Sequence, residues 1–138
     1  AFGAGQEICR PQRPDTIAKS LAIGDPADGP YALDLARATD GGIDSVTDDE
    51  IRAGIRLLAE TTGVFTETAG GVTTAVLAKL AGRGDISPDE RVVLYITGEG
   101  LKTLDATREG FRKHEIEPSL EDFERTVEHD RASAGTAA

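Results

Sequence analysis

A turn at residues 97–102 carries the side chains best suited to chemistry in this sequence. It reads Thr-Gly-Glu-Gly-Leu-Lys and directly follows the apolar run Val-Val-Leu-Tyr-Ile at 92–96. An unbroken apolar run of this length predicts a strand covered on both faces, as in a parallel sheet. Open α/β sheets bind ligands at the carboxyl ends of their strands. The hydroxyl of Thr97, and the close approach that Gly98 and Gly100 permit, therefore predict a ligand-binding turn.

A second run, at residues 65–72, also combines an apolar residue with a turn of small residues. It reads Phe-Thr-Glu-Thr-Ala-Gly-Gly-Val, so that an apolar residue leads through small residues into a predicted helix. Glu67 stands just before that helix, where a carboxylate interacts favourably with the amino end of the helix dipole. Two such small-residue turns predict one shared pocket.

Other kinds of site are disfavoured. Cys9 is the only cysteine, which excludes an internal disulfide and a thiolate metal cluster and leaves a small buried hydrophobe as its simplest interpretation. His114 and His129 lie fifteen positions apart on polar sequence, as surface residues do. The segment 98–103 lacks the glycine pattern of a phosphate-binding P-loop.

Length and charge set the class of protein. The 138 residues suit one ordinary domain, and apolar residues are frequent enough for a core. The net charge of -10 disfavours nucleic acid, which requires clustered Lys and Arg. We expect no membrane partner, because no apolar run reaches the roughly 18 residues that a spanning helix needs. Without a charged leader segment, a cytoplasmic location is expected.

The elements that would position these turns alternate between helix and strand. The capping box Thr-Asp-Asp-Glu at 47–50 predicts the clearest helix start, because the Thr hydroxyl and the Glu carboxylate satisfy each other's free backbone amides. The other expectations are helices over 15–21, 30–39 and 70–81, strands over 43–46 and 92–96, a late helix capped by Ser119, and a disordered tail over 132–138.

Several segments in order resemble the carboxyl-terminal part of threonine synthase, a pyridoxal-phosphate enzyme of the tryptophan-synthase-β fold type. They lie at 16–18, 23–26, 46–50, 63–71 and 97–102. The resemblance implies an α/β fold, a partial three-layer sandwich of the fold type II enzymes, over residues 1–105. Residues 106–138 would form a polar tail with one helix. It also implies the conversion of O-phosphohomoserine and water into threonine and phosphate.

The resemblance assigns cofactor-binding roles to a few residues. Thr97 matches the Ser or Thr whose hydroxyl faces the pyridine nitrogen of pyridoxal phosphate in this fold type, with Gly98 beside it. Glu67 matches an acidic position at the start of the helix that lines the cofactor cleft, although a helix-start acid is common without any function. Gly3 and Ala4 would lie against the cofactor face, but a short Gly/Ala run is more often only a turn.

The sequence departs from the family pattern at a few positions. Gly70 and Gly71 stand where many relatives carry Ala or Ser, and Glu99 stands where many carry His. The two glycines would change the wall of the cofactor pocket, and Glu99 would change the contacts with the substrate. A purely structural role is also possible for Thr97: it could be a strand residue whose hydroxyl forms a hydrogen bond with the next turn.

The resemblance places the Schiff-base lysine and the loop for the cofactor phosphate in an upstream part of the enzyme. The lysines present are Lys19, Lys79, Lys102 and Lys113, and none sits in a matching motif. We therefore expect no catalytic residue in this chain and no activity from it alone. Its partners would be the missing amino-terminal part, an amino-acid substrate and, in the complete enzyme, a second copy.

Two other interpretations stay open. The chain could belong to another fold type II enzyme, a threonine dehydratase or a cysteine-synthase-like protein. It could also be a noncatalytic half-domain that acts as a partner or a regulator. Phosphate release by the complete enzyme would support the threonine synthase interpretation, whereas ammonia and a keto acid would support a dehydratase.

Overall fold

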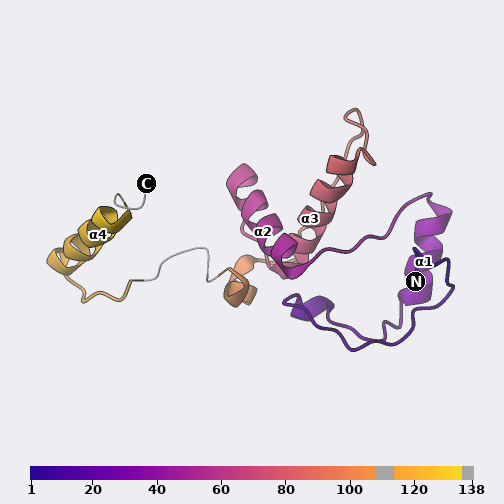
Figure 1. Cartoon of the computed structure of the whole chain (residues 1–138), viewed down its shortest axis with the longest axis horizontal. Helices are drawn as coiled ribbons and strands as arrows, with labels where there is room; N and C mark the ends of the chain where they lie inside the picture. The colour runs from indigo at the N-terminus through magenta and orange to yellow at the C-terminus, as the bar shows by residue number, and fades with distance from the viewer. Residues whose placement is uncertain (108–113, 135–138) are drawn as a thin grey trace. The chain divides into compact units, whose positions relative to one another are not determined.

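The computed structural model describes residues 1–107 and 114–134, with side chains as far as residue 127. The chain divides into two compact units, Ala1–Thr107 and Arg108–Ala138 (Figure 1). The first unit contains the short 3-10 helix η1 (Lys19–Leu21), the helices α1 (Gly29–Ala38), α2 (Asp48–Thr62) and α3 (Thr68–Arg83), and the 3-10 segment η2 (Gly100–Ala106). The second contains α4 (Leu120–Ala134).

Helix α2 begins at the predicted capping box. The Thr47 amide donates to Glu50 Oε2 at 2.6 Å, and the Glu50 amide donates to Thr47 Oγ1 at 3.3 Å. The helix ends at Gly63, whose φ of 75° lies in the left-handed region that glycine adopts without strain. The predicted start of this helix is therefore confirmed.

Helix α3 begins earlier than the sequence predicted. It starts at Thr68 rather than Gly70, because Glu67 takes the extended cap conformation and its carbonyl already accepts from the Gly71 amide at 3.1 Å. The two glycines therefore lie inside the first turns of the helix. Gly84, with a φ of 77°, ends it.

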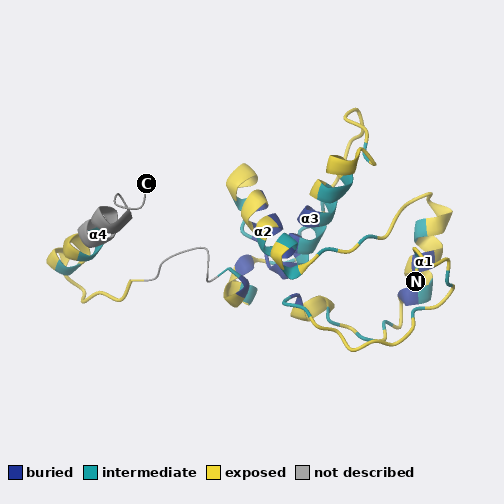
Figure 2. Cartoon of the chain, viewed as in Figure 1, coloured by how far each residue is buried: buried dark blue, intermediate teal, exposed yellow. Residues whose placement is uncertain are grey.

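Helices α2 and α3 cross in close contact at glycines. A Cβ atom on Gly54 would lie 2.5 Å from the Gly71 carbonyl oxygen, and one on Gly71 would lie 2.6 Å from Ile55 Cγ1. Beside this crossing Ile51 and Ile55 are fully buried, and Ala18 and Ala106 complete the core cluster. Figure 2 shows buried residues gathered where α2 and α3 come together.

The segment before α1 is less helical than predicted. Of the predicted helix over 15–21, only the single turn η1 is present. The carboxylate of Asp48 accepts from the Thr16 hydroxyl at 2.6 Å and from the Ile17 amide at 3.1 and 3.2 Å, and these bonds hold residues 16–17 in a turn. Helix α1 has Pro30 in its first turn, where the missing amide of proline costs nothing, as predicted.

The predicted strands over 43–46 and 92–96 are absent from the described residues. A strand is defined by backbone hydrogen bonds to a neighbour, and the bridge between Thr66 and Glu99 is isolated. Along 92–96 the Tyr95 carbonyl instead accepts from the Thr73 hydroxyl of α3 at 3.3 Å. Tyr95 and Val93 are 76% and 73% exposed, so their side of the segment is uncovered.

The second unit holds the predicted late helix. Ser119 caps α4, because its hydroxyl accepts from the Asp122 amide at 3.2 Å. The predicted disordered tail is wrong for residues 132–134, which belong to α4, whereas 135–138 lie outside the described residues. No helix in the described part of the chain combines the length and apolar character that crossing a membrane requires.

We expect Asp48 to make the folded state sensitive to acid. The hydrogen bond from Thr16 is the main cause that lowers the pKa of Asp48. A carboxyl group with a lowered pKa stabilises the folded state above its unfolded pKa of about 3.9, and the contribution is lost as the pH falls through the folded pKa. Stability to urea should therefore fall below about pH 4, and Asp48→Asn should flatten that fall.

Asp49→Asn is the matched control for this experiment, because it removes the same charge from the same turn of α2 but leaves the contact with Thr16 and Ile17. Urea midpoints would be measured for both variants near pH 7 and near pH 3. Parallel pH profiles for Asp48→Asn and the unmodified chain would contradict the assignment.

Candidate functional site

The two small-residue runs of the sequence lie side by side. The Glu67 amide donates to the Gly98 carbonyl at 3.1 Å, and the Gly100 amide donates to the Phe65 carbonyl at 3.1 Å. Thr66 and Glu99 form the bridge between these bonds. The turn at 97–102 therefore rests against the start of α3, and the shared pocket that the sequence predicted for these two runs stays a prediction.

Buried hydroxyls hold this junction together. Thr66 is fully buried, and its hydroxyl donates to the Gly98 carbonyl at 3.1 Å. The Thr68 amide donates to Thr103 Oγ1 at 3.2 Å, which ties η2 to the first residue of α3. The Thr68 hydroxyl is buried, with an exposed fraction of 0%, and finds no hydrogen-bond partner among the described residues.

Thr97 is an exposed member of the junction. Its residue is accessible to solvent, and its hydroxyl makes no hydrogen bond with a residue that the structure describes. It precedes Gly98, which is held by Thr66 and Glu67. A free hydroxyl is thus presented beside a backbone that is itself well fixed.

Glu67 is buried against the same turn. Only 9% of the residue is exposed, and a Cβ atom on Gly98 would lie 1.8 Å from its Oε1 atom. Glu67 is the N-cap residue of α3, but its side chain makes no capping hydrogen bond. The carboxylate therefore occupies the space that the missing side chain of Gly98 leaves open.

Gly3 and Ala4 belong to a different part of the unit. They are exposed, in a turn where the Gly5 amide donates to the Phe2 carbonyl at 3.0 Å. Arg37 of α1 donates to the Gln6 carbonyl at 2.6 Å. Among the described residues, the hydrogen bonds of this turn lead to α1 and not to Thr97 or Glu67.

Two lysines of the first unit bind backbone oxygens. Lys79 donates to the Ser45 carbonyl at 2.7 Å and pairs with Asp44 at 3.6 Å. Lys19 donates to the Thr16 carbonyl at 2.8 Å. Lys113 lies outside the described residues.

The described residues contain no group of three or more His, Cys, Asp and Glu side chains that could hold a metal ion. His114 is exposed, as predicted, and the side chain of His129 lies outside the described part. Cys9 is half-buried rather than buried, and it borders an apolar cavity of about 620 Å³ near Phe2 and Leu33.

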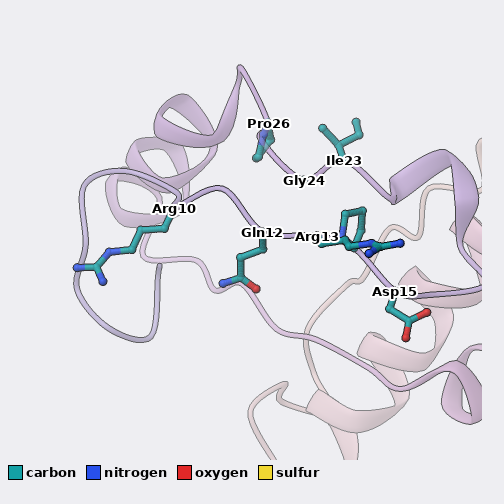
Figure 3. Close-up of a pocket in the computed structure, with 8 residues that line it drawn as sticks. Arg10, Gln12, Arg13, Asp15, Ile23, Gly24 and Pro26 are labelled. Atoms are coloured by element: carbon teal, nitrogen blue, oxygen red, sulfur yellow. The ribbon is translucent and has the colours of Figure 1, made fainter.

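A second cavity, of about 350 Å³, lies between residues 10–15 and 23–26 (Figure 3). The two segments are joined by the Gln12 amide, which donates to the Gly24 carbonyl at 2.8 Å. Arg10 and Arg13 extend in different directions from this cavity, so their guanidinium groups do not converge on one ligand.

Sequence reasoning missed one contact of the junction and one contact between helices. Thr103 meets the amide of Thr68 in the structure, but nothing in the local sequence distinguishes it from another polar residue of a helical turn. The crossing of α2 and α3 at Gly54 was also missed. A glycine inside a helical pattern is a signal that could have indicated it.

A family model described as pyridoxal-phosphate dependent enzyme matches residues 1–98, and the chain belongs to this family. Its members use pyridoxal phosphate as their cofactor. Among its relatives is a threonine synthase of Halalkalibacterium halodurans, 44% identical over 66% of this chain. A threonine synthase of Methanocaldococcus jannaschii is 42% identical over 73% of it.

A cysteate synthase of Methanoregula boonei is 31% identical over 83% of the chain. The matched regions are only 26%, 25% and 28% of these three relatives. The chain therefore spans about a quarter of the length of the curated relatives that it matches.

Proposed function

We propose that this chain is the carboxyl-terminal part of an enzyme like threonine synthase, which converts O-phosphohomoserine and water into threonine and phosphate. The observation that carries the proposal is the junction between the turn at 97–102 and the start of α3. This junction occurs in a chain that is 44% and 42% identical to two threonine synthases over most of its length.

In this proposal Thr97 offers its hydroxyl to the pyridine nitrogen of pyridoxal phosphate. The cofactor supplies an electron sink for carbanion chemistry when it is bound. A neutral hydroxyl does not hold that nitrogen protonated as a carboxylate would, so Thr97 would moderate the sink. The exposure of Thr97 and its lack of a partner among the described residues fit this role.

Gly98 and Glu67 would form the wall beside the cofactor ring. Gly98 brings the backbone close, and the Thr66 and Glu67 bonds to its carbonyl fix its position. Gly3 and Ala4 would lie against the cofactor face. Because their turn is bonded to α1, this last assignment also requires the turn to meet the junction in the complete enzyme.

The remainder of the enzyme would complete the fold. Residues 92–96 are apolar and uncovered on the side of Val93 and Tyr95. We propose that they become a strand of an α/β three-layer sandwich when neighbouring strands are supplied.

The remainder of the enzyme would also supply the Schiff-base lysine, so the chain alone should form no threonine. We further propose that the complete enzyme is a cytoplasmic homodimer.

The test of the function uses the complete enzyme with Thr97→Val, and Thr97→Ser as its matched control. Losing a hydrogen bond between neutral groups costs about 0.5–1.5 kcal/mol, so Thr97→Val should slow threonine formation by roughly two- to tenfold. Thr97→Ser keeps the hydroxyl and should retain most of the rate. Unchanged threonine formation by Thr97→Val would contradict the role of Thr97.

The cysteate synthase relative, which matches the largest share of the chain among the three, supports a second candidate function. Analysis of the amino acid that the complete enzyme forms would separate the two, because threonine supports the first and cysteate the second. Ammonia and a keto acid would indicate a threonine dehydratase, and a cysteine product a cysteine-synthase-like enzyme. A noncatalytic half-domain would instead be monodisperse and fold cooperatively by itself.

A further inference from the structure

A third cavity, of about 280 Å³, lies between the turn before α1 and the segment η2. It is lined by Ile17, Lys19, Lys102, Thr103, Asp105 and Ala106. Two of the four lysines of an acidic chain therefore border one cavity, although they are more than eighty positions apart in the sequence. Both lysines are exposed, whereas Ala106 is buried and Ile17 is half-buried, so the floor is apolar and the rim is cationic.

Lys19 is held at the rim by a chain of hydrogen bonds. Asp48, at the start of α2, fixes Thr16 and Ile17 through its carboxylate. The ammonium of Lys19 then donates to the Thr16 carbonyl at 2.8 Å, which satisfies one of its three protons. The other two remain available as donors, on a side chain whose position is already set.

Thr103 adds a neutral donor. Its oxygen accepts from the Thr68 amide at 3.2 Å, so the hydroxyl proton of Thr103 is not used in that bond. Thr103 also has a non-helical backbone (φ -135°, ψ 44°) at a kink within η2.

The charge and size of the cavity indicate its ligand. Two ammonium groups and one carboxylate leave a formal charge of about +1 on its lining, within a chain of net charge -10. The volume lies at the lower end for small-molecule sites, which suits a compact ion rather than a nucleotide. Phosphate oxygens are preferred partners of lysine ammonium groups.

We propose that Lys19, Lys102 and Thr103 form a binding site for a phosphate group, either inorganic phosphate or a short phosphate monoester. The two ammonium groups neutralise its charge, the Thr103 hydroxyl donates to a third oxygen, and Ile17 and Ala106 leave room for a short aliphatic part. The site is separate from Thr97 and does not depend on the proposed enzyme activity. Its test therefore succeeds or fails independently of that function.

The experiment titrates the 138-residue chain with inorganic phosphate at constant ionic strength and follows its backbone amide resonances by NMR. Saturable shifts are expected at Ile17, Lys19 and residues 102–106. Lys19→Gln and Lys102→Gln should each weaken binding by about tenfold, the effect of one charge-assisted hydrogen bond. Asp105→Asn should tighten binding, because it removes the negative charge from the lining.

Lys79→Gln is the matched control, because it removes the same charge at a side chain that is bonded to Ser45 and Asp44. It should leave the phosphate affinity unchanged. Methyl phosphate distinguishes the two sources: binding comparable to that of phosphate indicates a monoester site, and much weaker binding indicates a site for the free ion. Shifts that do not saturate, or an equal loss in Lys79→Gln, would overturn the proposal.

Discussion

Replacing Gly54 with valine should lower the free energy of unfolding by roughly 1–3 kcal/mol, the usual cost of forcing extra atoms into a packed interior. A Cβ atom at this position would lie 2.5 Å from the Gly71 carbonyl oxygen, 3.0 Å from the Ala75 amide nitrogen and 3.1 Å from Ala75 Cβ. Two of these atoms belong to the backbone of α3, so no change of rotamer relieves the contact. Helices α2 and α3 would have to separate.

Urea unfolding followed by circular dichroism measures this effect. Gly82→Ala is the control within the same helix pair, because Gly82 lies inside α3 and a Cβ atom there would meet nothing within 4 Å. Alanine should stabilise that position by about 0.5–1 kcal/mol through the lower backbone entropy of the unfolded chain. An unchanged midpoint for Gly54→Val would show that the two helices do not cross at this glycine.

Replacing Gly98 with alanine should disrupt the junction through a single side chain. The new methyl group would lie 1.8 Å from Glu67 Oε1 and 2.3 Å from Glu67 Cδ. The φ angle of Gly98 does not lie in the left-handed region, so alanine causes no backbone strain there. The loss of stability therefore comes from the collision with Glu67 alone. Because Glu67 is buried, it has little room to move away, and we expect a loss of roughly 1–3 kcal/mol.

Shortening Glu67 should relieve that loss. In Glu67→Ala the colliding atoms are gone, so the double variant should be more stable than the sum of the two single effects predicts. A double-mutant cycle measures the coupling, which for residues in contact is about 0.5–3 kcal/mol. In the complete enzyme, cofactor absorbance would report whether the same pair shapes the proposed pocket wall. Strictly additive effects on stability would contradict the contact.

Local signals in the sequence predicted where three of the helices begin. The capping box at 47–50, the proline at the start of α1 and Ser119 before α4 each act through the adjacent backbone. The start of α3 was misplaced because two glycines usually mark a turn. Here they lie inside the helix, where their lack of side chains lets Thr66 and Ile51 approach.

Long-range contacts account for what the sequence could not predict. Residues 92–96 have the composition of a strand, but a strand exists only through its neighbours, and the described residues supply none. The turn at 16–17 depends on Asp48, which lies 32 positions beyond Thr16. The two small-residue turns led to the prediction of one shared pocket, but nothing in the sequence indicated that Thr103 and the buried Thr66 join them.

The hydrogen bonds of Asp48 also bear on the order in which the first unit folds. Helices α2 and α3 are separated only by residues 63–67, so their pairing closes a short loop. The bond between Asp48 and Thr16 closes a loop of 32 positions, which costs more chain entropy. Local pairing precedes such closures in small domains. We therefore expect the amino-terminal turn to dock on a helix pair that has already formed, so acid should raise the unfolding rate more than it lowers the folding rate.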